Sequence, residues 1–325
     1  MAESSAYPTF NPKGSRFDES TYFGRIRSFL DVVDPRLLAV SDNELNQAKG
    51  LLQDFDAGKV DRSKVSDKDL WEAKKIRDGL TNPGTGETIF APFRFSAFVP
   101  ANISLVYGML NAHSVGSVLF WQWANQSYNS ATNYANRSGS DMSTEEIATS
   151  YSIAIATSCG LAMAFRWLGN NGPQAFKRMA RIPFVIPYIA VAGAGAANVY
   201  ATRRSEIENG VMVKDANDND LGVSQEAGRQ GVMKTIISRS LGLPIPVLVI
   251  PALIMHFVPK TLPKRVLVAA ELLVISSSLC VGLPATLAIF PQKMALDAQS
   301  LEPAFHNLRD ENGERITTVY SNKGL

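Results

Sequence analysis

Five side-chain amides recur at helical spacing in the segment 120–139, FWQWANQSYNSATNYANRSG. The steps between them are four, three, four and three residues, so a helix places all of them on one face: Gln122, Gln126, Asn129, Asn133 and Asn136. Each amide offers two donors and one acceptor without carrying a charge. Such a face can hold a carboxylate and an ammonium group together, which is the chemistry needed to bind a zwitterion.

The same segment has a second interpretation. Trp121 and Trp123 are of the type that anchors a helix at a membrane–water interface, and amides in such a helix need not bind a ligand. The segment directly follows an apolar run, so both interpretations place it at or in a membrane. Composition leaves the choice between them open.

Three further polar residues lie in or beside apolar runs. Asn198, on a stripe of small residues, either bonds a neighbouring helix or faces a substrate. Arg239 either meets a substrate carboxylate or reaches lipid headgroups. Glu271 either snorkels to the interface or couples a proton or cation to transport, since an ionised carboxylate at the bilayer centre costs roughly 2.5–3.5 kcal/mol. The predicted substrate-binding set is Gln122, Gln126, Asn129, Asn133, Asn198, Arg239 and Glu271.

The sequence argues against an enzyme. Its histidines, His113, His256 and His306, are far apart, and no nucleophile elbow, phosphate-binding loop or dinucleotide fingerprint is present. Cys159 and Cys280 lie inside apolar runs and indicate neither a disulfide framework nor a zinc site. A net charge of +2 without a basic stripe argues against nucleic-acid binding. We therefore expect no catalytic residue, no metal and no cofactor.

Five apolar runs must position these side chains: 98–121, 147–168, 179–200, 235–258 and 266–290. Each is near the ~20 residues that cross a bilayer, and together they would overfill the core of a soluble helical enzyme of this size. The first run is interrupted by the polar cluster 111–114. We predict an all-α, multi-pass membrane protein with about five transmembrane helices, whose partner is the lipid bilayer.

Prolines fall inside the last three runs: Pro183, Pro187, Pro244, Pro246, Pro251 and Pro284. Each removes a backbone hydrogen bond that lipid cannot replace, so several helices are predicted to be broken by proline. At LGLPIP, residues 241–246, the prolines predict one of two structures: a kinked helix whose freed backbone groups bond to neighbouring groups, or a discontinuous helix of the kind found in transporters.

Charge divides the chain into three parts. Residues 1–95 are highly charged and predict a small polar helical module, 96–290 form the transmembrane domain, and 291–325 form a C-terminal tail. In the module, residues 1–20 are expected to be disordered. Ser41 with Glu44 and Ser66 with Asp69 are capping boxes that predict a helix near 42–57 and a second one after Ser66.

Positive charge predicts the topology. Lysines and arginines cluster in the connections after the second and fourth runs, whereas the connection after the first run has only Arg137. This places the N-terminal module and both basic connections on one side, the cytosol- or matrix-equivalent face, and the C-terminus on the other side. The basic residues of the connection between the third and fourth runs weaken this assignment: Arg203, Arg204, Lys214, Arg229 and Lys234.

The chain resembles the sideroflexin family, also called the mitochondrial tricarboxylate carrier family, along nearly its whole length. The motifs that carry the resemblance are FDESTYFGR at 17–25, DPR at 34–36, LW at 70–71 before NPGTGE, FWQWANQSYNSATNYANR, FPQ at 290–292 and the C-terminal VYSNKGL. PFRFSAFVP at 92–100 and PIPVLVIPALIM at 244–255 resemble most the citrate-linked branch or its fungal relatives. The family's usual HPDTGE is NPGTGE here, so any role of that histidine and aspartate is in doubt at Asn82 and Gly84.

The resemblance implies a multi-pass protein of the mitochondrial inner membrane, imported without a cleaved presequence, with its N-terminal region in the matrix. It also implies transport of serine and similar small amino acids for one-carbon metabolism, and any iron role would be indirect. The first 20 residues agree, since they have no apolar core and carry Glu3, Asp18 and Glu19.

Three hypotheses follow: a carrier of serine or a similar small neutral amino acid, a citrate or tricarboxylate carrier, and a non-transporting inner-membrane scaffold. A trianion needs several cationic contacts, and the membrane-facing candidates are few: Arg166, Arg181 and Arg239. The odd number of predicted helices leaves homo-oligomerisation open.

Overall fold

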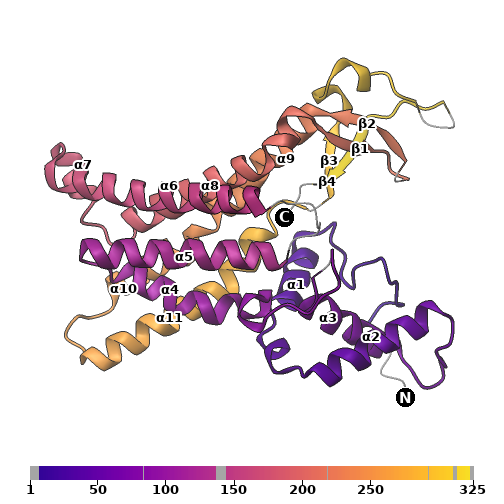
Figure 1. The fold of residues 1–325 in the computed structure, drawn as a ribbon, viewed down its shortest axis with the longest axis horizontal. Coiled ribbons are helices and arrows are strands. Elements are labelled where there is room, and N and C mark those ends of the chain that lie inside the picture. The colour runs from indigo at the N-terminus through magenta and orange to yellow at the C-terminus, as the bar shows by residue number, and fades with distance from the viewer. Residues whose placement is uncertain are drawn as a thin grey trace.

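The computed structural model describes residues 7–82, 84–136, 144–217, 219–291, 293–309 and 313–322. The chain is a multi-pass helical membrane protein with one small sheet (Figure 1). Four helical stretches are long and apolar enough to cross a membrane: Glu145–Asn171, Val185–Glu208, Gln225–Phe257 and Lys264–Leu287. They correspond to the second to fifth predicted runs.

The membrane domain contains α4 (Phe98–Leu110), α5 (Val115–Ala135), α6 (Thr144–Asn171), α7 (Gln174–Met179), α8 (Val185–Glu208), α9 (Gln225–Thr235), the π-helical segments η4 (Ile236–Gly242) and η5 (Ile245–Val249), α10 (Ile250–Phe257) and α11 (Lys264–Leu287). Its largest core cluster joins α4, η5 and α11, where Val106, Leu248, Ile275 and Leu279 are fully buried.

The first apolar run is not one helix. Its polar cluster at 111–114 divides it into α4 and α5, which fold back on each other as a helical hairpin (Figure 1). Ser114 starts α5 with a capping box: Ser117 N donates to Ser114 Oγ and Ser114 N donates to Ser117 Oγ, both at 3.0 Å. With 13 residues, α4 is roughly 20 Å long and too short to cross ~30 Å of hydrocarbon.

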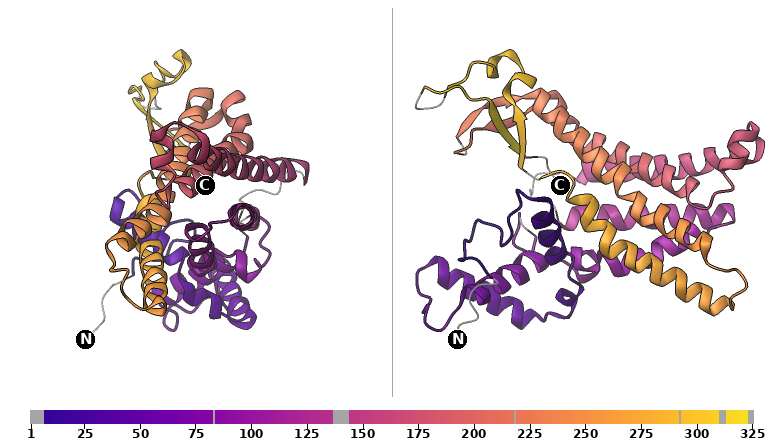
Figure 2. Two further views of the ribbon diagram at one scale, coloured as in Figure 1. Left: turned by 90° about the vertical axis from the view of Figure 1, so that its left-hand side faces the viewer. Right: turned by 180° about the vertical axis from the view of Figure 1, so that it is seen from behind.

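The hairpin overturns the predicted topology. Because α5 returns to the end from which α4 started, the N-terminal module and the C-terminal strands lie at the same end of the bundle (Figures 1 and 2). The basic connections, with Lys177, Arg178, Lys260 and Lys264, lie at the opposite end, together with the hairpin tip. The prediction that the module and these connections share one side, with the C-terminus opposite, is wrong because it counted the hairpin as a single crossing.

The proline-rich fourth run stays helical. Instead of unwinding at 241–246, the backbone widens into η4 and η5, so the discontinuous helix predicted as one alternative is absent from this stretch. Ser278 Oγ of α11 donates to the carbonyl oxygen of Pro246, and a Cβ at Gly282 would stand 2.1 Å from Pro246 Cβ. A neighbouring helix therefore satisfies the widened backbone, as the kink interpretation requires. π-Helical turns are frequent at functional sites.

The N-terminal module contains α1 (Tyr22–Val32), the 3₁₀ turn η1 (Pro35–Ala39), α2 (Asp42–Asp56), α3 (Asp67–Leu80) and the 3₁₀ turns η2 (Ala91–Phe93) and η3 (Phe95–Ala97). Both predicted capping boxes are confirmed. The expected disorder of residues 1–20 is wrong for residues 7–20, because Phe10 is 7% exposed and packs edge-on against Phe55 and Trp71. Residues 1–6 lie outside the described residues.

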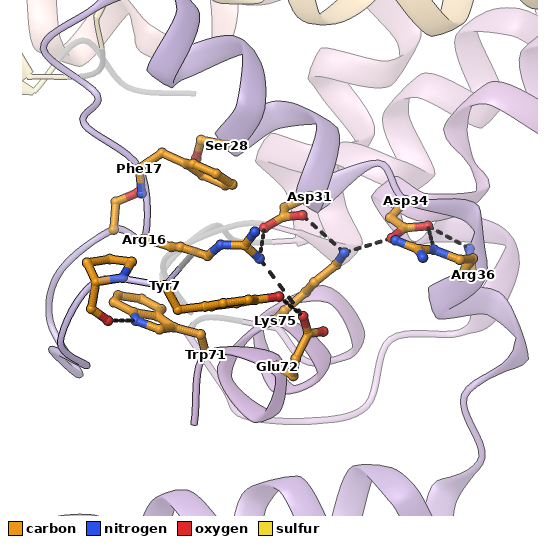
Figure 3. Close-up of polar contacts among 12 residues, drawn as sticks. Tyr7, Arg16, Phe17, Ser28, Asp31, Asp34, Arg36, Trp71, Glu72 and Lys75 are labelled. Atoms are coloured by element: carbon orange, nitrogen blue, oxygen red, sulfur yellow. Dashed lines mark hydrogen bonds and ion pairs between the residues drawn. The ribbon is translucent and has the colours of Figure 1, made fainter. Parts of the chain in front are cut away.

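An ion-pair network holds α1 to α3 (Figure 3). Lys75 Nζ lies 2.7 Å from Asp34 Oδ2 and 3.1 Å from Asp31 Oδ1, and its side chain is only 12% exposed. Hydrogen bonds from Arg36 and then from Lys75 hold the pKa of Asp34 well below its ordinary value of 3.8. The stabilisation from Asp34 is therefore complete above about pH 4 and is lost as the pH falls through the lowered folded-state pKa.

The module closes the ends of two membrane-domain helices. Arg25 Nε of α1 donates to the carbonyl oxygen of Ala288, just beyond α11, at 2.8 Å. Tyr22 OH donates to Ala285 O at 2.9 Å. Helix ends leave carbonyl groups without intrahelical partners, and a cation there is also favoured by the helix dipole.

Asn82 closes the end of α5. Its Oδ1 accepts from the backbone N–H groups of Gly84 and Thr85 at 2.8 and 2.9 Å, and its Nδ2 donates to Ala135 O at 2.8 Å. One buried amide thus bonds the backbone of Gly84 and Thr85 on one side and the end of α5 on the other.

A four-stranded antiparallel sheet completes the fold and was not predicted. Its order is β2 (Asp220–Ser224), β1 (Val211–Lys214), β4 (Thr318–Asn322) and β3 (Lys293–Asp297). With α9 and the 3₁₀ turns η6 (Ala298–Ser300) and η7 (Pro303–Phe305), it buries its own core of Val213, Ala227, Met294, Leu296 and Val319. The segment predicted as a C-terminal tail therefore pairs with the connection between α8 and α9.

Four helices are long enough to cross the membrane, and the α4–α5 hairpin returns to the end from which it started, so the number of passes is even. Both termini are therefore predicted to face one compartment. In sealed vesicles of one orientation, protease should remove tags at the N- and C-terminus together, or spare both. A tag inserted between Pro259 and Lys260 should behave oppositely, because that connection lies at the other end of the bundle. Removal of only one terminal tag would contradict the hairpin.

Lys75→Met should destabilise the N-terminal module by about 1–3 kcal/mol, because it leaves two carboxylates without their shared partner in a poorly hydrated place. The measurement is the midpoint of thermal unfolding in detergent. Lys74→Met is the matched control: Lys74 pairs at 2.7 Å with the half-exposed Asp78 one turn away. Its loss should change stability by no more than about 0.5 kcal/mol. Equal effects of both variants would contradict a structural role of the network.

Candidate functional site

The amide face of α5 points into the protein and towards α6. Gln122 is 2% exposed and Gln126 5%, whereas Phe120 and Trp123 on the other side of α5 are 53% and 47% exposed. Ser158 Oγ of α6 donates to Gln122 Oε1 at 2.7 Å, and Gln126 Nε2 reaches the same hydroxyl at 3.5 Å. The first half of the predicted face is thus partly occupied by a serine that follows 32 residues after Gln126.

The second half of the face reaches η4. Asn129 is half-buried and Asn133 exposed. Arg239 Nη2 donates to Asn133 Oδ1 at 3.3 Å, a long bond to a neutral partner. Arg239 belongs to none of the ion pairs among the described residues. The structure therefore brings together two residues of the predicted set that are 106 positions apart.

Asn136, the last amide of the stripe, has a structural role. Its Nδ2 donates to Phe93 O at 2.8 Å and to Thr132 O at 2.7 Å. It binds the end of α5 to η2 of the N-terminal module.

A cavity of about 210 Å³ lies at the hairpin-tip end of α5. Gln122 lines it together with His113 of the tip, Arg166 at the end of α6 and Arg181 before α8. Arg166 Nη2 donates to His113 O at 2.7 Å and so ties the tip to α6. Among the described residues, no carboxylate lines the cavity and no ion pair includes Arg166 or Arg181.

These groups can bind a small carboxylate. Gln122 Nε2 has no hydrogen-bond partner among the described residues, and both guanidinium groups can donate to an anion. The volume is below the ~300–1,000 Å³ of pockets for drug-sized ligands, which suits a metabolite of few heavy atoms.

The remaining predicted residues do not join one site. Asn111 Nδ2, at the hairpin tip, donates to Glu271 Oε1 at 2.9 Å, which places Glu271 at the end of the bundle opposite Arg239. Asn198 is half-buried on α8, and its backbone carbonyl accepts from Thr202. It lies between two contacts of α8 with the fourth run, Gly195 against Ser240 and Arg203 with Thr235.

The sequence indicates Arg166 and Arg181 as scarce cationic partners for a trianion, but its spacing does not connect them with Gln122. Ser158 was not singled out. The interruption at 111–114 was the available signal, because a turn there brings His113 back over the first turns of α5. Among the described residues, no group of three histidine, cysteine, aspartate or glutamate side chains could hold a metal ion.

Comparison with known proteins gives the family. The sideroflexin family model matches residues 11–325. Similar proteins include Sideroflexin from Dictyostelium discoideum, 40% identical with 99% of each chain covered, and Sideroflexin FSF1 from Saccharomyces cerevisiae, 36% identical with 100% of each covered. Human Sideroflexin-5 is 34% identical, with 98% of this chain and 94% of that protein covered. No solved structure matches. The protein of 325 residues is a member of the sideroflexin family.

Proposed function

We propose that this protein carries serine or a similar small neutral amino acid across the mitochondrial inner membrane, in support of one-carbon metabolism. The observation that carries the proposal is the cavity at the hairpin tip, which the buried Gln122 lines together with Arg166 and Arg181, two arginines that belong to none of the ion pairs among the described residues. A substrate carboxylate would accept from the guanidinium groups and from Gln122 Nε2. Its ammonium group would donate to carbonyl oxygens of the tip or the amide face.

The amide face supports a path rather than an isolated pocket. From Gln122 to Asn133 the helix rises by roughly 16 Å, and near each end stands an arginine that has no carboxylate partner among the described residues. Between them α5 presents neutral amides, which hydrate and bind a zwitterion without trapping it by charge. Asn129, Asn133, Asn198 and Arg239 would contact the substrate on the far half of this path, and Glu271 would act at the tip.

A second candidate, a citrate or tricarboxylate carrier, is favoured by one specific observation. The described lining of the cavity includes two arginines and a histidine but no acidic residue, which is more positive charge than one carboxylate requires. The rest of the path has fewer cations, so we place this candidate second.

Purified protein in proteoliposomes should take up labelled serine. Arg181→Gln should weaken the apparent affinity by about tenfold or more, because a charge-assisted hydrogen bond to the substrate carboxylate is lost. Lys260→Gln is the control, since it removes an exposed cation from the same end of the bundle outside the cavity. Equal uptake by both variants and the wild type would exclude Arg181 from the site.

Unlabelled citrate separates the two candidates in the same vesicles. If the substrate is a neutral amino acid, excess citrate should leave serine uptake nearly unchanged while alanine or cysteine reduces it. Strong inhibition by citrate, together with uptake of labelled citrate itself, would make the tricarboxylate function the correct one.

A further inference from the structure

A second polar line runs along α5, on the side facing α4 and η2. It consists of Asn125, Tyr128 and Thr132, at steps of three and four residues, so the three side chains share one face of the helix. The ring of Tyr128 lies 6.4 Å from that of Phe93 and 6.3 Å from that of Phe98, which places this face against η2 and the start of α4.

Each of the three residues carries a buried hydrogen-bonding atom without a partner: Asn125 Nδ2, Tyr128 OH and Thr132 Oγ1. Asn125 is 3% exposed and Thr132 2%. The hydroxyls of Tyr128 and Thr132 lie close enough to interact with each other, but their contact falls short of full hydrogen-bond geometry, and neither hydroxyl has another described partner. Three of the seven such atoms among the described residues therefore lie on one line of one helix.

The first amide face differs in this respect, because none of its side-chain atoms is among the fully buried atoms that lack a partner in the described part of the chain. Gln122 and Gln126 meet Ser158, and Asn133 meets Arg239, so that face joins α5 to α6 and η4 through protein partners. Lipid offers no partner to a buried donor, and leaving one unmet is costly, so an unsatisfied line in a membrane helix requires an explanation other than stability.

We propose that Asn125, Tyr128 and Thr132 line the translocation path, and that water and the substrate complete their hydrogen bonds when α4 parts from α5. This rests on the proposed transport function and deepens it by extending the lining of the path from the amide face of α5 to its α4 side. The line carries no charge, and its hydroxyls can both donate and accept. It fits a small neutral solute with hydroxyl, ammonium and carboxylate groups, and it offers a trianion no cation along its length.

Stability and transport should change in opposite senses. Thr132→Val keeps the shape of the side chain and removes its unmet hydroxyl, so the unfolding temperature should stay the same or rise while serine uptake falls about fivefold to tenfold. Asn125→Leu should behave alike. Ser158→Ala is the control, because it removes hydrogen bonds that Ser158 makes to Gln122 and Gln126, and it should therefore lower the unfolding temperature. Unchanged uptake by folded Thr132→Val and Asn125→Leu would overturn the proposal.

Cysteine labelling tests the path without assuming the substrate. In a background with Cys159→Ala and Cys280→Ala, Asn125→Cys and Thr132→Cys should react with a hydrophilic methanethiosulfonate in lipid vesicles, and serine should slow the reaction. Phe120→Cys, on the lipid-facing side at a residue 53% exposed, should not react. Absence of labelling at both positions would overturn the proposed path. Labelling in a protein that moves no serine would retain the path and reject serine as substrate.

Discussion

The polar break at 111–114 is the constraint on which the rest of the structure depends. Apolar sequence on both sides would allow one long crossing, but the capping box of Ser114 and Ser117 satisfies the backbone donors of a new helix and the chain reverses. The reversal makes the number of passes even, gathers both terminal regions at one end and sets the polar side of α5 against the bundle, while Phe120 and Trp123 stay exposed on the other side. The amides of α5 can exist there only because α4, α6 and the N-terminal module cover that polar side.

Local rules predicted the elements well and their arrangement poorly. The capping boxes, the positions of the long apolar helices and the common face of Gln122 and Gln126 all follow from spacing of three or four residues. Topology does not, because it depends on whether one short interruption bends the chain or turns it back. The sheet was missed for a related reason: its strands have only four or five residues, and its two halves are joined through β1 and β4, which lie about 100 positions apart in the sequence.

The candidate site shows the same limit at the level of single side chains. Spacing identifies polar residues on a face, but it cannot tell which of them are already bonded. Ser158 comes from another helix and hydrogen-bonds Gln122 and Gln126. Asn125 is next to Gln126 in the sequence, yet no described group bonds its Nδ2. The polar groups that most need a ligand are those without a hydrogen-bond partner in the protein. Tertiary contacts, rather than residue type, therefore distinguish side chains that line a path from side chains that only pack.

The N-terminal module is a structural part of the membrane domain. Arg25 binds the carbonyl beyond α11 and Asn82 the end of α5, while Asn136 of α5 reaches back to Phe93. The module thus ties together the ends of two helices that pack on either side of α4. Removing it would expose helix-end carbonyls and free α4 as well, so loss of transport in a truncated protein could not show that the module itself acts as a scaffold. Point variants that release one contact at a time are the informative ones, because each leaves the rest of the network in place.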